Sequence, residues 1–178
     1  MDRRVSLFLA EITDDVLIDS HADPLDLYWE DDTFEILIDE DASGGIHLED
    51  YNAFAYHIAL DNQIVDIGPS ANGDDVRPRL YPNHAMARWQ RSSNSSNQLY
   101  WEVKIAVHDD SHVYGDDLSS RVMLETGKNM GLMVVYCDAD DSNGRQLFIG
   151  DTEVEPVNGD RNRGYIDAST FGSLTLVE

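Results

Sequence analysis

A tryptophan stands among carboxylates where the chain passes into an apolar run. Trp29 is followed by Asp32 and Glu35 in the stretch Trp29-Glu-Asp-Asp-Thr-Phe-Glu-Ile-Leu-Ile-Asp39. An aromatic face packs against the C–H groups of a sugar ring, and carboxylates form charge-assisted hydrogen bonds with sugar hydroxyls. Trp29 and Glu35 would share a face if the strand already runs extended from residue 29. The pattern predicts a carbohydrate site, and the alternative is a tryptophan packed at the edge of the fold beside a solvated acidic loop.

Acidic residues also gather with the oxygen density that calcium needs. Calcium takes about six to eight oxygen ligands from flexible loops. Three groups have this density, namely Asp14-Asp15 with Asp19, Asp39-Glu-Asp41 with Glu49-Asp50, and Asp138-Ala-Asp-Asp-Ser-Asn143, which Gly144 follows. The last group lacks the bidentate glutamate of an EF-hand loop. We expect a structural calcium ion among these groups, with Asp39, Asp41, Asp138 and Asp140 as the candidate ligands, and chance clustering in an acidic chain is the competing explanation.

The histidines and the cysteine show no pattern of a reactive centre. His108 and His112 are four residues apart, but Asp-Asp-Ser separates them and predicts a loop, so we expect no transition-metal site. His84 and Met86 offer the ligand types of some haem-binding sandwiches, and nothing else in the chain supports haem. Cys137 is the single cysteine, which excludes an internal disulfide and predicts a buried, inert thiol.

No enzyme signature appears either. The chain has no Gly-x-Ser-x-Gly elbow and no glycine loop of the phosphate-cradling kind. Two acids could still meet across a glycosidic bond by chance, because acids are abundant. We therefore expect a non-catalytic binding domain. The alternatives are a glycan-active enzyme or enzyme subunit on the same scaffold, or an assembly domain whose sugar site has lapsed.

Charge limits the classes of partner. Among 178 residues there are 35 acids and 12 bases, a formal net charge of −23. Such a surface repels nucleic acid and anionic lipid, so neither is expected as a partner. The N-terminus lacks the apolar length of a signal peptide, and no segment is long and apolar enough to span a membrane.

Two-residue alternation dominates the elements that must position these residues. Leu99, Trp101 and Val103 alternate with Tyr100 and Glu102, which predicts a half-buried strand with Trp101 in the core. About nine such strands are predicted, separated by polar turns, with one short helix at 116–128. The expected fold is all-β, a single antiparallel β-sandwich over residues 1–178 of jelly-roll or immunoglobulin type with long acidic loops. The predicted strands are 5–12, 34–38, 54–60, 63–67, 85–89, 99–107, 132–137, 146–149 and 174–177.

Five segments, in the same order, resemble the family 9 carbohydrate-binding modules, which are sugar-binding, DOMON-like sandwiches. Ser6-Leu-Phe-Leu-Ala10 is similar to an early strand of that family, and the Trp29–Asp39 stretch to its tryptophan-x-x-aspartate motif. The other three are Tyr100-Trp-Glu-Val-Lys-Ile105, the acidic turn Cys137–Arg145, and the closing Tyr165-Ile-Asp-Ala-Ser-Thr-Phe-Gly-Ser-Leu-Thr-Leu176.

The resemblance implies a module that binds a plant-type or marine polysaccharide, such as glucan or xylan, often at a chain end, and that commonly holds calcium. It implies that Tyr165 supplies a second aromatic ring opposite Trp29. Asn162 and Arg145 would then offer hydrogen bonds to sugar hydroxyls. An extracellular or periplasmic location also follows from the resemblance.

The family has further strands before the segment that begins at Ser6. Either earlier residues supply those strands, or another chain completes the sheet edge. A homodimer through this N-terminal edge is therefore one expectation.

Overall fold

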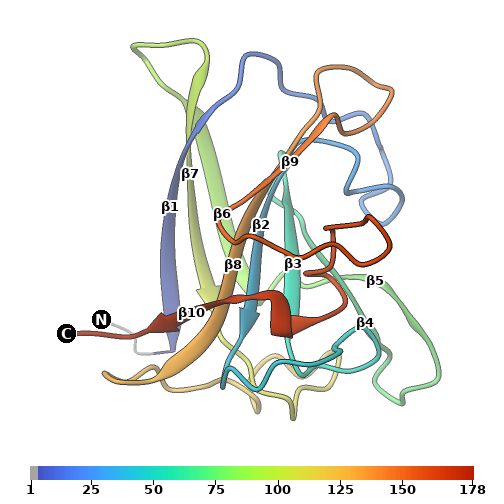
Figure 1. Ribbon diagram of the computed structural model, residues 1–178, viewed down its shortest axis with the longest axis vertical. Helices are drawn as coiled ribbons and strands as arrows, with labels where there is room; N and C mark the ends of the chain where they lie inside the picture. The colour runs from blue at the N-terminus through green and yellow to red at the C-terminus, as the bar shows by residue number, and fades with distance from the viewer. Residues whose placement is uncertain (1–3) are drawn as a thin grey trace.

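The structure is a computed structural model that describes residues 4–178. In that range ten strands form two antiparallel sheets that lie face to face, and the predicted all-β sandwich is confirmed (Figure 1). Among these residues, no helix is long and apolar enough to cross a membrane.

The smaller sheet has three strands in the order β1-β7-β6, namely β1 (Val5–Thr13), β7 (Gln98–Ala106) and β6 (Ala85–Arg91). Side chains of β7 alternate as predicted, with Leu99, Trp101 and Val103 buried between the sheets. In the described part of the chain, β1 pairs only with β7, and its other edge carries no strand. The homodimer through this edge stays a prediction.

The larger sheet has seven strands in the order β10-β8-β2-β3-β4-β5, and β9 pairs with β8 beside this path. Because β10 pairs with the beginning of β8 and β9 with its end, both lie along the edge of β8 that faces away from β2. The strands are β2 (Thr33–Asp39), β3 (Phe54–Ala59), β4 (Ile64–Pro69), β5 (Val76–Leu80), β8 (Asn129–Asp138), β9 (Leu147–Gly150) and β10 (Gly172–Thr175).

Both faces of the central strand β2 are buried. Phe34, Ile36 and Ile38 point into the core between the sheets. Leu37 belongs to a second cluster on the outer face, which the segment between β9 and β10 covers with side chains that include Tyr165. A strand buried on both faces reads as a nearly continuous apolar run, as 33–39 does. Glu35 therefore points into the covered outer face.

The predicted helix at 116–128 is wrong. The one helix among residues 4–178 is a 3₁₀ turn, Ala168–Thr170. In 116–128 the carboxylate of Asp116 accepts hydrogen bonds from Leu118 N and Ser119 N, and the chain makes tight turns instead. Val122 then donates its N–H to Val107 O, which ties the segment to the continuation of β7. Local side-chain acceptors thus compete with the helical backbone pattern.

Trp101 is fully buried in the core between the two sheets, as predicted. We expect Trp101→Ala to lower the free energy of unfolding by about 3–5 kcal/mol, because it removes a large side chain from packed surroundings and leaves a cavity. Leu9→Ala in β1 is the control, since Leu9 is 68% exposed and should change stability little. Urea unfolding measures both, and equal small effects would contradict this assignment of the core.

Candidate functional site

A pocket of about 300 Å³ opens above the outer face of the larger sheet. Loop residues before β2 and after β8 form its walls together with the segment that precedes β10. It includes four of the six residues predicted to bind sugar, Trp29, Arg145, Asn162 and Tyr165. The complete lining is Tyr28, Trp29, His57, Ile67, Arg145, Asn162 and Tyr165.

Glu30 fixes the ring of Trp29 beside this pocket. The indole Nε1 donates a hydrogen bond to Glu30 Oε1 at 2.9 Å, and the other carboxylate oxygen accepts from Arg145 N at 2.9 Å. Gly144 permits this approach, because its φ is +104° and a Cβ there would lie 2.5 Å from Glu30 Oε2. One carboxylate therefore joins the loop that carries the aromatic ring to the loop that carries the arginine.

Arg145 and Tyr165 reach the pocket from supported positions. The Arg145 guanidinium lies over the ring of Phe148, 4.6 Å from its centroid, and Nη1 donates to Cys137 Sγ at 3.3 Å. The remaining guanidinium donors can serve a ligand. Tyr165 packs on the outer cluster directly after Gly164, where a Cβ would lie 2.6 Å from Leu37 Cδ2. The chain can therefore sit close to β2 at this point.

A buried ion pair lies under the pocket. His57 of β3 lines it, and His57 Nε2 lies 3.0 Å from Glu35 Oε1, which also accepts from Cys137 Sγ at 2.9 Å. Burial alone would raise the pKa of Glu35 and lower that of His57, but their mutual attraction and hydrogen bonds reverse both shifts. The contact thus favours the ionised form of Glu35 and the protonated form of His57. Glu35 acts on the pocket through His57 rather than by lining it.

Asp32 does not line the pocket. The strand begins at Thr33, so the chain is not extended from residue 29, and Asp32 is fully buried. Its carboxylate accepts from Ile18 N at 2.5 Å and from Ala139 N at 2.9 Å. Asp32 therefore joins the loop before β2 to the loop after β8.

Asp32 belongs to a cluster of three carboxylates. One oxygen each from Asp14, Asp32 and Asp138 lies within 4.8 Å of the other two. Burial raises the pKa of Asp32 to about 7, and the neighbouring charges of Asp14 and Asp138 add to the shift. Asp14 also accepts a hydrogen bond from Tyr136 Oη at 2.5 Å.

The four aspartates predicted to bind calcium are distributed over both ends of the β2–β8 pair. Asp138 belongs to the three-carboxylate cluster, whereas Asp140 is exposed two residues later. Asp39 ends β2, at the opposite end from Asp32, where it accepts from Gly44 N at 2.7 Å. Asp41 is exposed beside it and accepts from Ser43 N at 3.0 Å. Of these four, only Asp138 joins the cluster, where it meets Asp14 from another of the acidic groups considered for calcium and Asp32, which was predicted as a sugar ligand.

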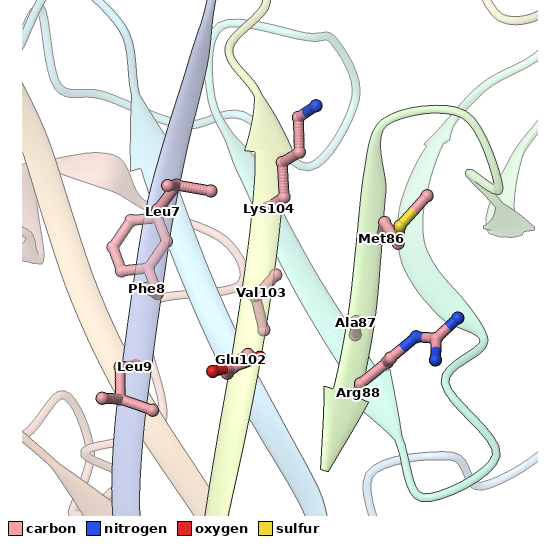
Figure 2. Close-up of a pocket in the computed structure, with 9 residues that line it drawn as sticks. All are labelled: Leu7, Phe8, Leu9, Met86, Ala87, Arg88, Glu102, Val103 and Lys104. Atoms are coloured by element: carbon pink, nitrogen blue, oxygen red, sulfur yellow. The ribbon is translucent and has the colours of Figure 1, made fainter. Parts of the chain in front are cut away.

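A second hollow, of about 370 Å³, lies along the smaller sheet. Figure 2 shows Leu7 and Leu9 of β1 beside Glu102 and Lys104 of β7, with Met86 and Arg88 on β6. Its one aromatic lining residue, Phe8, packs against the core between the sheets. The hollow therefore lacks a free aromatic platform, and the pocket at Trp29 remains the candidate site.

Sequence reasoning missed Tyr28, His57 and Ile67 of the pocket lining. Tyr28 touches both neighbours, with its ring edge-on to Trp29 at 5.0 Å and to His57 at 4.8 Å between centroids. The signal for His57 was its pairing opposite Glu35 in adjacent strands. That pairing becomes visible only once β2 and β3 are placed in register.

This chain is similar to known proteins both in sequence profile and in fold. A family profile described as "Carbohydrate family 9 binding domain-like" matches residues 2–178. A family 9 carbohydrate-binding module from Caldicellulosiruptor kristjanssonii in complex with cellotriose has a TM-score of 0.66 and 18% identity, over 99% of this chain and 71% of that one. A family 9 module from the same organism in complex with glucose has a TM-score of 0.63 and 18% sequence identity, and the match covers 98% of this chain and 72% of that one. At this identity the likeness shows the fold. No curated protein matches significantly.

We expect the pKa of His57 to exceed its ordinary value of 6.5 in the folded protein, and Glu35→Gln to lower it, because the largest contribution that opposes burial, the attraction of Glu35, is then removed. The contribution of His57 to stability is complete below about pH 6.5 and is lost as pH rises through its raised pKa. That of Glu35 is present above its ordinary pKa of 4.5 and is lost as pH falls through its lowered pKa.

Glu35→Gln should therefore lower the free energy of unfolding most between about pH 4.5 and 6.5, by roughly 1–3 kcal/mol. NMR titration of the imidazole and urea unfolding at several pH values measure the two effects. An unchanged His57 titration in Glu35→Gln would show that the pair does not hold the proton.

Proposed function

This chain belongs to the carbohydrate family 9 binding domain-like family, and from that premise we propose that its pocket at Trp29 binds a sugar unit of a polysaccharide without cleaving it. The observation that carries the proposal is the joint lining of one pocket by Trp29, Tyr165, Arg145 and Asn162. The aromatic rings would take the apolar faces of a pyranose, and the polar side chains its hydroxyl groups.

The size of the pocket favours a short segment. About 300 Å³ is at the lower end of the range for small-ligand sites, roughly 300–1,000 Å³. A β-glucan is the first substrate class to test, since the similar solved structures hold cellotriose and glucose. Xylan is the second. The guanidinium of Arg145 adds a positive charge to the lining of this strongly acidic molecule.

A glycan-active enzyme is the alternative. Hydrolysis of a glycosidic bond uses two carboxyl groups that flank it. The pocket lining contains no aspartate or glutamate. Of the carboxylates beside and beneath it, Glu30 accepts hydrogen bonds from Trp29 and Arg145, and Glu35 is buried and paired with His57. This distribution favours binding over turnover. Reducing sugar released by the purified protein would overturn the proposal.

We expect Trp29→Ala to weaken binding of cellotriose by at least about tenfold, ~1.4 kcal/mol, because the stacking surface is lost. Tyr165→Ala should weaken it as well. Isothermal titration calorimetry with cellotriose and xylotriose measures the affinities. Tyr100→Ala is the matched control, since this partly exposed ring lies on β7 outside the pocket lining. Wild-type affinity in Trp29→Ala would exclude this pocket, and no binding of any glycan by the wild type would favour an assembly domain.

We also propose that calcium binds at Asp14, Asp32 and Asp138. Three carboxylates that converge in a partly buried place repel one another unless a cation or protons neutralise them. Their oxygens are the ligands calcium prefers, and backbone carbonyls and water would complete its coordination. Asp32 lies on the loop that carries Trp29, and Asp138 ends β8 just before the loop that carries Arg145, so the ion would hold both walls of the pocket.

We expect a chelator to lower the melting temperature and calcium to restore it, because an ion bound only by the folded state stabilises that state. Asp138→Asn should abolish the response, and Asp140→Asn should retain it. Differential scanning calorimetry with and without calcium decides. If Asp140→Asn abolishes the calcium-dependent change in melting temperature and Asp138→Asn retains it, the ion binds at Asp140. If both variants retain the change, the ion binds elsewhere, and Asp39 and Asp41 are the next residues to test.

The family assignment further supports an extracellular or periplasmic location for this domain, which we propose with the polysaccharide as its partner.

A further inference from the structure

Three histidines converge inside the fold. His84 directly precedes β6, and His108 and His112 follow β7, the strand that pairs with β6. One ring nitrogen of each lies within 4.8 Å of one from each of the others. Their residue exposures are 1%, 3% and 5%. The sequence predicted no transition-metal site, because Asp-Asp-Ser between His108 and His112 indicated a loop rather than a helical metal-binding pair. His84, the third histidine, is distant in the chain.

The same nitrogen is left without a hydrogen bond in all three rings. Nε2 of each histidine is buried and has no hydrogen-bond partner. An unpaired buried polar atom costs about 1–3 kcal/mol, and three of them at one place call for a common partner. Because both ring nitrogens of a neutral histidine are polar, packing alone does not account for this arrangement.

The opposite nitrogens all have partners. His84 Nδ1 lies 2.7 Å from Tyr56 Oη. Ser120 Oγ, fully buried, lies 2.8 Å from His108 Nδ1 and 3.1 Å from His112 Nδ1. Hydroxyl oxygens can accept from Nδ1–H, and that tautomer leaves the Nε2 lone pair free. Metal-binding histidines are commonly oriented in this way by a second shell.

A carboxylate stands at the rim. Asp117 Oδ1 lies 3.3 Å from His84 Nε2 without hydrogen-bond geometry, while Oδ2 accepts from Asn83 Nδ2 at 2.7 Å.

We propose that the Nε2 atoms of His84, His108 and His112 bind a divalent transition-metal ion of the zinc class, with Asp117 Oδ1 as the fourth ligand. Three imidazoles and one carboxylate form a tetrahedral set for Zn²⁺, with ligand distances of about 2.0–2.2 Å. The His84 and His108 rings are stacked with their centroids 4.0 Å apart, so binding one ion through both Nε2 atoms requires these rings to turn. Calcium prefers oxygen ligands, so this site and the carboxylate cluster select different ions.

The site would fasten the 107–122 segment to the end of the sandwich, and it is separate from the sugar pocket. Tyr56, which contacts His84, points into the core from β3. His57, the next residue, lines the pocket on the outer face of the same strand. Binding of zinc should therefore raise the melting temperature without being required for sugar binding.

The experiment uses the full chain, stripped of metal with a chelator and titrated with Zn²⁺ and Co²⁺. We expect one equivalent of zinc per chain, a higher melting temperature, and the visible absorption of tetrahedral, nitrogen-ligated Co²⁺. His112→Gln should abolish binding at stoichiometric zinc. Ser120→Ala keeps all four ligands and should weaken the affinity by about 10–100-fold. Asp117→Asn should weaken it while retaining bound metal.

Two controls keep the result specific. Asp138→Asn leaves the histidines intact and should bind zinc like the wild type. If His112→Gln does not fold, the Ser120→Ala affinity and the cobalt spectrum decide. No stoichiometric zinc in the wild type, or equal affinity in wild type and His112→Gln, would overturn the site. Loss of zinc only in Asp138→Asn would assign the ion to the carboxylates, and unchanged affinity in Asp117→Asn would remove Asp117 as fourth ligand.

Discussion

Burial of both faces of β2 is the constraint on which the candidate site depends. The inner face meets the smaller sheet, and the segment before β10 covers the outer face. Covering the outer face does two things. It holds Tyr165 and Asn162 across from the loop that carries Trp29, and it removes water from Glu35, which must then find partners within the protein.

Charge in this protein has two roles that depend on burial. Most of the 35 acidic residues can be solvated, and they keep the molecule strongly negative. The few that are buried have defined structural partners. Glu35 is paired with His57, and Asp32 accepts backbone N–H groups from two loops. A cation at Asp32 and its neighbours would neutralise a place where the fold concentrates repulsion.

Strand β3 separates two kinds of chemistry because its side chains alternate between faces. Tyr56 points inward to His84, in a cluster of buried imidazoles with free nitrogens. His57 points outward to the pocket beside aromatic and amide groups. The inner site offers buried nitrogen ligands, so it suits a metal. The outer site offers ring faces and exposed donors, so it suits a sugar.

The sequence by itself determined the all-β fold, the buried face of β7 and four residues of the pocket lining, because alternation and local motifs are short-range properties of the chain. The prediction that Asp32 lines the pocket was wrong, because residues 29–32 form a turn instead of an extended strand. The helix expected in 116–128 was also wrong, because the Asp116 carboxylate accepts hydrogen bonds from backbone N–H groups there. Only the tertiary structure placed His57 beside Glu35, Asp14 beside Asp32, and His84 beside His108 and His112. These groupings depend on strand register and on chain segments far apart in sequence, and a linear pattern carries no record of which strands pair.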